Sequence, residues 1–377
     1  MTYDARTSST RVDERQLVYD VHAHIVPAAL LREPTTTAAG GVPVAVPGAE
    51  ARGVGARGVG TRDGADPAVP GVAAGTGTAE VRARVGSRET PPVPLALRDV
   101  GTRLAAMDRA GVDVQVVSPW VELQPAGLPA AEALAHVRRV NDALAEEVRR
   151  APDRLVAMGI VPLHDGPAAA RELERIVVDL GMCGALLTTS GVGLDLADAG
   201  LEPLWEAARR RRALLMLHPY RPLEADRTRR DGTGDLIGTP LESTVAVAGL
   251  LRAGVLERAP DLRICVVHGG GALPALAGRI DALWGSDVPD SPPSAQLRSL
   301  YFDTLTHDDR ALRWLREFAG DDRLLLGSDF PFPTGEAHPV ERVDALPALD
   351  RYARAAILGG NLAALLAQVD HGLAGSG

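Results

Sequence analysis

Eight short apolar segments, separated by stretches with helical spacing, constrain the fold of this chain more than any other feature. The segments lie at 17–24, 112–118, 155–163, 183–189, 213–219, 262–268, 300–305 and 323–329. Near-continuous runs of Val, Ile and Leu are typical of parallel strands that are buried on both faces. Helices are expected at 99–110, 129–150, 166–180, 199–212, 241–258, 272–284, 308–319 and 351–367. Eight strand–helix units predict an α/β protein folded as a (β/α)8 TIM barrel.

The regular pattern is interrupted after the first strand by a low-complexity insertion at 35–97. It is rich in Gly, Ala, Val, Pro and Arg and shows neither strand nor helix periodicity. We expect most of it to be disordered, with a short hairpin near 79–88 and with its ends able to serve as a lid. Residues 1–16 are expected to form a loose N-terminal tail, so that 17–377 make up one barrel domain.

Composition excludes several classes of function. The formal net charge is −9 and no basic patch with interleaved aromatics occurs, which argues against a nucleic-acid partner. No apolar run reaches the roughly 20 residues that span a membrane, and the polar start is unlike a secretory signal. Cys183 and Cys265 lie inside apolar runs, so we expect buried thiols in a reducing cytoplasm. All 40 basic residues are arginine, which excludes Schiff-base chemistry, a Walker lysine and a metal-bridging carbamylated lysine.

Histidines and one aspartate collect where the predicted strands end. His22 and His24 close the first strand and, being two residues apart, project from the same face. His218, His268 and Asp329 close the fifth, sixth and eighth strands. Each alone is compatible with a structural role, such as a histidine that donates to a backbone carbonyl or an aspartate that caps a helix. Together, at the active-site face of a TIM barrel, they indicate a catalytic divalent metal held by three imidazoles and one carboxylate, with one position left open.

Four motifs around these residues, DVHAHIVP, LHPY, VVHGGGALPALAGRID and LLGSDFPFPTGE, resemble the amidohydrolase superfamily. They are most similar to its branch of metal-dependent decarboxylases that includes aminocarboxymuconate-semialdehyde decarboxylase. The resemblance covers 17–34 and about 97–367. It implies that the metal ligands are His22, His24, His218 and Asp329. It also implies that His268 is the general acid/base beside the metal and not a ligand.

Other features of this resemblance concern the substrate pocket. Phe332 matches a pocket-wall aromatic, and Arg279 matches an arginine that reaches the active site of a neighbouring subunit, which implies a homodimer. The segment after His218 lacks the tryptophans and methionines of the branch, so a more polar pocket roof is expected. The branch also carries a substrate-binding arginine in its first-strand insertion. Arg84 is the expected counterpart and Arg88 the alternative, although either is equally compatible with a solvated surface position.

The function implied by the resemblance is that of a metal-dependent decarboxylase without an organic cofactor, acting on a small unsaturated or aromatic carboxylic acid. Zn²⁺ is the expected ion and Mn²⁺ the alternative. Asp329 serves catalysis as a ligand, and His268 exchanges a proton near neutral pH. A hydrolase or hydratase on the same scaffold is the first alternative, and a barrel that binds ligand without turnover is the second. His307, which follows the seventh strand, is a further candidate for the site.

Overall fold

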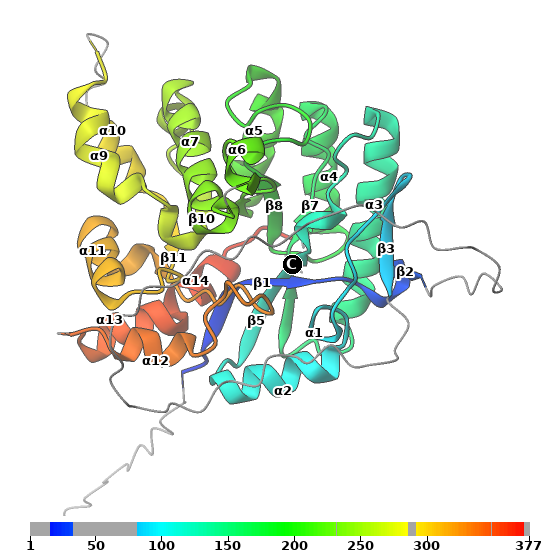
Figure 1. Ribbon diagram of the computed structural model, residues 1–377, viewed down its shortest axis with the longest axis horizontal. Helices are drawn as coiled ribbons and strands as arrows, with labels where there is room; N and C mark the ends of the chain where they lie inside the picture. Colours follow the sequence, from blue (N-terminus) through cyan, green and yellow to red (C-terminus); the bar gives the residue numbers. More distant parts are fainter. Residues whose placement is uncertain (1–15, 33–80, 231, 286–291, 348, 373–377) are drawn as a thin grey trace, which may run out of the picture.

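The computed structural model describes residues 16–32, 81–230, 232–285, 292–347 and 349–372 (Figure 1). Residues 1–15 of the predicted tail (1–16) and residues 35–80 of the predicted insertion (35–97) lie outside the described residues. In the described part, parallel strands occupy the middle and most helices lie around them (Figure 1). The α/β class predicted from the sequence is therefore confirmed.

Parallel strands form in all eight of the predicted segments. They are β1 (Tyr19–Ile25), β5 (Val114–Pro119), β6 (Leu155–Ala157), β7 (Gly159–Ile160), β8 (Gly184–Thr188), β9 (Leu214–His218), β10 (Arg263–Val266), β11 (Tyr301–Asp303) and β12 (Leu324–Leu325). Neighbours follow sequence order in two sheets, β1-β5-β6 and β7-β8-β9-β10-β11-β12. Met158 alone separates β6 from β7, so the third predicted strand is divided. The chain around and after β12 runs beside β1, because Val21 N donates to Leu326 O and Ala23 forms a parallel bridge with Phe330.

The helices follow most of the predicted ranges. They are α1 (Leu95–Arg98), α2 (Val100–Ala110), α3 (Ala130–Val148), α4 (Gly166–Val178), α5 (Glu202–Arg211), α6 (Ala225–Arg230), α7 (Thr239–Arg252), α8 (Val255–Arg258), α9 (Leu273–Ala282), α10 (Pro293–Leu297), α11 (Asp309–Ala319), α12 (Pro339–Asp344), α13 (Arg351–Ala355) and α14 (Asn361–Leu366). The predicted helix 241–258 is divided into α7 and α8, with Gly254 at a φ of 69° between them. The predicted helix 351–367 contains a π-helical turn at 356–360 between α13 and α14. The short helices α1, α6, α10 and α12 were not predicted.

A small antiparallel sheet lies outside the parallel strands. It consists of β2 (Leu31–Arg32), β3 (Arg82–Val85) and β4 (Arg88–Glu89). The β3–β4 pair confirms the hairpin predicted near 79–88. Ala83 and Val85 are buried, so this end of the insertion packs against the rest of the protein.

The buried core is continuous through the parallel strands. Every residue of β8 and β9 is buried, as expected for strands that are covered on both faces. Cys183 and Cys265 are free and buried in this core. None of the helices in the described ranges is long and apolar enough to cross a membrane.

Candidate metal centre and catalytic cavity

Four side chains that are far apart in the sequence converge at the ends of the parallel strands. One ligand atom each from His22, His24, His218 and Asp329 lies within 4.8 Å of the others, and all four residues are buried. The Nε2 atom of His24 lies 3.3 Å from Nε2 of His22 and 3.2 Å from Nε2 of His218. It also lies 3.2 Å from Oδ1 of Asp329. The structure thus brings together the four residues that the resemblance indicates as metal ligands.

The strands place these groups through their two-residue repeat and through their ends. His22 and His24 lie on the same face of β1, and His218 is the last residue of β9. The segment after β12, which carries Asp329, approaches β1 closely because residue 327 is a glycine. A Cβ atom at Gly327 would lie 3.2 Å from the Cβ of His22, and closer still to the neighbouring strand. The glycine therefore allows the carboxylate to reach the histidines.

The second ring nitrogen of each histidine is held by a polar contact. Nδ1 of His22 lies 2.8 Å from Oδ2 of Asp303. Nδ1 of His24 lies 3.2 Å from Oγ of Ser118, and Nδ1 of His218 lies 2.8 Å from the carbonyl oxygen of Pro219. Carboxylate and carbonyl oxygens can only accept, so Nδ1 is the donor in His22 and His218. These contacts fix the ring orientations and direct Nε2 toward the shared centre, as partners of metal-binding histidines usually do.

Asp303 connects the metal centre to the loop that carries His268. Its side chain is fully buried at the end of β11. While Oδ2 accepts from His22, Oδ1 accepts from the backbone N–H groups of Gly269 at 2.7 Å and Leu305 at 3.3 Å. The sequence analysis did not select Asp303. It lies at the end of β11, so the criterion of a polar residue at a strand end would have included it.

The arrangement fits a divalent cation. In a tetrahedral site with bonds of about 2.0–2.1 Å, neighbouring ligand atoms lie about 3.3 Å apart. Four of the six separations between the ligand atoms are 3.2 or 3.3 Å and match this value. All six are within 4.8 Å. Burial opposes the charge of Asp329, but the nearby His22 and His24 hold its pKa below the usual range. Oδ1 of Asp329 is buried and accepts no well-aligned hydrogen bond from the described residues, so a cation would stabilise it.

His268 lies beside this group without being part of it. Its ring centroid lies 5.4 Å from those of His22 and His218. Its Nδ1 atom is buried and has no hydrogen-bond partner among the described residues. Burial, with a contribution from His22, lowers the pKa of His268 to about 4. A neutral imidazole with a free ring nitrogen is suited to accept a proton.

Three glycines after His268 turn the chain sharply before α9. All three, Gly269 to Gly271, have positive φ angles. A Cβ atom at Gly271 would lie 2.1 Å from the carbonyl oxygen of Pro240, at the start of α7. This close approach brings the beginnings of α7 and α9 together at the cavity, where both contribute lining residues.

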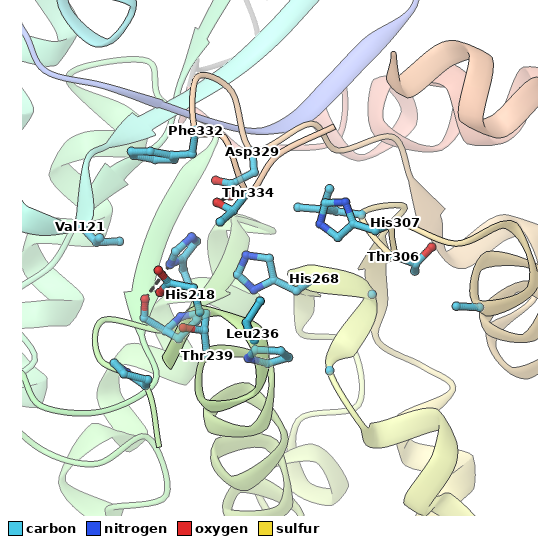
Figure 2. A pocket seen from close by; sticks show the side chains of 18 of the residues that line it. Val121, His218, Leu236, Thr239, His268, Thr306, His307, Asp329, Phe332 and Thr334 are labelled. Carbon is cyan, nitrogen blue, oxygen red and sulfur yellow. Dashed lines mark hydrogen bonds between the residues drawn. The ribbon is translucent and has the colours of Figure 1, made fainter. Parts of the chain in front are cut away.

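The metal centre opens into a cavity of about 890 Å³ (Figure 2). Its wall includes His218, His268 and Phe332. The ring of Phe332 lies with its centroid 5.4 Å from that of His24 and 6.3 Å from that of Trp120. Phe332 and Trp120 therefore form an aromatic wall beside His24, one of the candidate ligands.

The rest of the lining combines polar and apolar groups. Tyr220, Asp235 and Leu236 come from the segment after β9, and Thr306 and His307 come from the segment after β11. The side chain of Leu236 is 74% exposed at the same cavity. The segment after His218, which was predicted to form a polar roof, is therefore only partly polar. His307, the further candidate from the sequence, lies at the cavity wall (Figure 2).

The arginines expected to bind substrate do not line this cavity. Arg84 is exposed on β3 and lines a separate, smaller cavity. Arg88 forms an ion pair at 2.7 Å with Glu122, which does line the catalytic cavity. Arg279 is exposed on α9, one helical turn beyond the lining residue Ala275. The part of the lining that belongs to the described residues therefore contains no arginine.

Comparisons with known proteins place these features in a family. Residues 19–367 match the amidohydrolase family model. The 2-amino-3-carboxymuconate-6-semialdehyde decarboxylase of Dictyostelium discoideum is 29% identical over 269 residues, which cover 70% of this chain and 75% of that protein. The crystal structure of 5-carboxyvanillate decarboxylase from Sphingomonas paucimobilis is 27% identical, with a TM-score of 0.67 and coverage of 74% of this chain and 87% of that one.

A further solved structure contains a metal and an inhibitor. It is a dihydroxybenzoic acid decarboxylase from Polaromonas sp. with bound manganese and 2-nitroresorcinol, 27% identical, with a TM-score of 0.65. The match covers 72% of this chain and 87% of that one. Since the family model spans nearly the whole chain, and the motifs that suggested it surround the converging histidines and aspartate, this protein belongs to the amidohydrolase family.

Proposed function

We propose that this protein is a metal-dependent decarboxylase that needs no organic cofactor and acts on a small unsaturated or aromatic carboxylic acid. The observation that carries the proposal is the buried group of His22, His24, His218 and Asp329, with His268 beside it at a large cavity. The decarboxylases among its relatives and structural neighbours support the reaction class. We also propose that the strands close into the predicted TIM barrel, because the first and last segments are hydrogen-bonded to each other.

In this reaction the bond to the carboxyl carbon breaks, CO₂ leaves, and a proton takes its place on the remaining carbon. When bound, a divalent metal supplies a Lewis acid that stabilises negative charge on substrate oxygens. The electron pair left on carbon spreads into a conjugated or aromatic system, which is why acids of this class are favoured. His268 is neutral near pH 7 and relays a proton from the substrate or solvent to that carbon.

The cavity supports a flat substrate with polar substituents. Phe332 and Trp120 offer an aromatic wall on which a ring can pack. Asp235, Thr306 and His307 offer hydrogen-bonding groups elsewhere in the lining. An aromatic acid that carries hydroxyl or amino groups matches both features.

Two arginines are proposed to act on the substrate carboxylate from outside the lining. Arg88 is favoured over Arg84 because its guanidinium lies against Glu122 at the cavity, whereas Arg84 lies in a different cavity. For Arg279 we propose that it acts across the interface of a homodimer. It forms no ion pair with the described residues, and its position beyond Ala275 is unfavourable for reaching the metal centre of its own subunit.

Exposed apolar side chains at the cavity support the dimer. Leu236 and Trp314 both line the cavity and are 74% and 49% exposed. Large apolar groups gathered at a cavity opening mark a surface that a partner can cover. A two-fold partner would shield them and would present its own Arg279 to the same opening.

We propose Zn²⁺ as the native ion, with Mn²⁺ as the alternative, because three imidazoles and one carboxylate suit both. Manganese in the structural neighbour supports the alternative. A cytoplasmic location remains a prediction, supported by two free cysteines that are both buried.

The reaction is tested with the metal-loaded protein and a panel of hydroxylated aromatic and unsaturated dicarboxylic acids. We expect CO₂ release matched by a product that has lost the mass of CO₂. The matched control is the His268→Ala variant, which retains the four ligands. A product one water heavier than the substrate would indicate the hydrolase or hydratase instead. Saturable ligand binding with no product from any acid would indicate a barrel without turnover.

The dimer is tested by mixing two inactive variants, Arg279→Ala and His268→Ala. A mixed dimer contains one site with both residues intact, so activity should return, up to about half of the wild-type value per mixed dimer. Arg313→Ala, an exposed arginine on α11, serves as the charge-matched control and should remain active without mixing. If subunits exchange and no activity returns, Arg279 does not act across the interface.

A further inference from the structure

A second cavity, of about 350 Å³, is lined by three arginines from three different elements. Arg32 comes from β2, Arg84 from β3 and Arg139 from α3. The remaining lining consists of Ala29, Leu30, Leu31 and Gly86. None of these residues lines the catalytic cavity, so the two cavities are separate. Figure 1 shows β2 and β3 beside α3 at the edge of the molecule.

The positive charge of this cavity is not paired with a carboxylate in its described lining, and the adjacent Glu89, opposite Arg84 in the β3–β4 hairpin, forms no ion pair with it. No Asp or Glu is among the lining residues that the structure describes, and within the same ranges none of the three arginines forms an ion pair. By contrast, Arg138, the neighbour of Arg139 on α3, pairs with Glu172 at 3.2 Å. Guanidinium groups brought together without a carboxylate repel one another. In a chain with a net charge of −9, such a cluster points to an anionic ligand.

A buried histidine orients Arg139 without neutralising it. Nε2 of His136 lies 2.7 Å from the carbonyl oxygen of Leu123, which can only accept, so this nitrogen carries the proton. Nδ1 of His136 is therefore free to accept from Nη2 of Arg139, at 2.8 Å. His136 is buried on α3, and burial lowers its pKa, which keeps the ring neutral. A neutral acceptor fixes the guanidinium in place and leaves its charge available to a ligand.

We propose that the cavity between Arg32, Arg84 and Arg139 is a binding site for a small dianion with tetrahedral or carboxylate oxygens. Guanidinium groups bind phosphate and carboxylate oxygens through paired N–H donors, so three of them match an anion with several oxygens. The proposal is independent of the decarboxylase function. It also gives Arg84, which does not line the catalytic cavity, a role as an anion contact at a different site.

The site is tested by isothermal titration of the full-length, metal-loaded protein at constant ionic strength. Inorganic phosphate, sulfate and succinate are the probes, so that phosphate-type and dicarboxylate ligands are distinguished. We expect saturable binding of at least one probe with a stoichiometry of one per chain. Because hydrogen bonds to charged groups are strong, Arg84→Gln and Arg139→Gln should each weaken it about ten- to hundredfold. The matched control is Arg310→Gln, whose side chain is 85% exposed on α11 and which should bind as the wild type does.

Two further comparisons separate a built site from general electrostatic attraction and from binding at the metal centre. Arg84→Lys keeps the charge but loses the paired donors, so it should bind more weakly than the wild type and more tightly than Arg84→Gln. Equal binding by Arg84→Lys and wild type would reduce the site to general electrostatic attraction and overturn the proposal. Binding that survives in both glutamine variants would place the anion at the metal centre, with the same consequence. The absence of saturable binding of all three probes to the wild type would also refute it. Thermal unfolding without anion checks that the variants fold as the wild type does.

Discussion

Replacing Asp303 by asparagine tests whether one buried carboxylate serves both the metal centre and the His268 loop. The substitution keeps the shape of the side chain and removes its charge and one of its two acceptor oxygens. In the wild type, Oδ2 accepts from Nδ1 of His22 at 2.8 Å, and Oδ1 accepts from Gly269 N at 2.7 Å and Leu305 N at 3.3 Å. An asparagine has one oxygen for three donors, so one set of contacts must be lost.

The two orientations open to the substituted amide have different consequences. If its oxygen stays with Gly269 and Leu305, its NH₂ group donates to Nδ1 of His22, and the proton of that ring moves to Nε2. The histidine then presents a proton where the metal requires a lone pair. If the oxygen stays with His22, the NH₂ group faces two backbone N–H groups, and buried donors lose their acceptor at a cost of about 1–3 kcal/mol each. The metal-free protein should favour the first orientation, and the metal-bound protein must adopt the second.

The expected magnitude follows from this switch. Loss of a partner behind a metal-binding histidine typically lowers metal affinity about 10–100-fold, which corresponds to about 1.4–2.8 kcal/mol. We therefore expect Asp303→Asn to weaken metal binding within that range, and the metal-bound variant to unfold more easily than the metal-bound wild type. Competition with a chromophoric chelator at fixed pH measures the first effect, and chemical denaturation measures the second. Asp322→Asn, whose side chain is 76% exposed, is the matched control. Metal affinity within about twofold of the wild type would refute the reasoning.

Three other perturbations test the assignment of roles. The double variant His22→Ala plus His218→Ala should lose the metal. Elemental analysis of the wild type should give one ion per chain, and two tightly held ions would contradict the ligand set. His268→Ala should retain the metal and lose about 10²–10⁴-fold in turnover, because it removes only proton transfer; loss of metal would make His268 a ligand. Burial lowers the pKa of His136 below 6.5 in the folded chain. As the pH falls below 6.5, the unfolded chain therefore binds more protons than the folded chain, and the free energy of unfolding decreases. His136→Gln should show a shallower loss of unfolding free energy over that range in denaturation experiments, and parallel profiles would contradict this.

The strands and the strand-end residues that converge in the structure were predictable from the sequence because both depend on local patterns. An apolar run identifies a buried parallel strand, and the residue that ends such a run lies at the active-site face. The separation of four proposed ligands from His268 came from the family resemblance. The positions at which helices are interrupted could not be predicted from the sequence in the same way. The π-helical turn at 356–360 lies within an otherwise regular helical pattern. Its Gly359 packs against the segment that leads into β1, because a Cβ there would lie 2.3 Å from the carbonyl oxygen of Leu17. Contacts of that kind depend on tertiary structure.

The assignment of Arg84 shows why the insertion resisted prediction. In the β3–β4 hairpin, Arg84 lies opposite Glu89, and Val85 lies opposite Arg88. Residues that are directly opposite share a face of the sheet, so Arg88 lies on the face of the buried Val85 and Arg84 on the other. The first face carries Arg88 to Glu122 beside the catalytic cavity, whereas Arg84 lines the smaller cavity. The register of two short strands therefore separates arginines that the sequence could not distinguish, since a shift by one residue would exchange their faces.

The charges and contacts of the site also show why one ion, and not two, is expected. Two carboxylates, Asp303 and Asp329, lie among three imidazoles, so one divalent cation balances the group. Asp303 is not available as a ligand, because Oδ2 is engaged by His22 and Oδ1 by Gly269. A second ion would need a bridging group, and a chain without lysine cannot form a carbamate for that purpose. Oδ1 of Asp329 is the carboxylate oxygen of this group that has no hydrogen-bond partner among the described residues, so the group offers a carboxylate ligand to one ion.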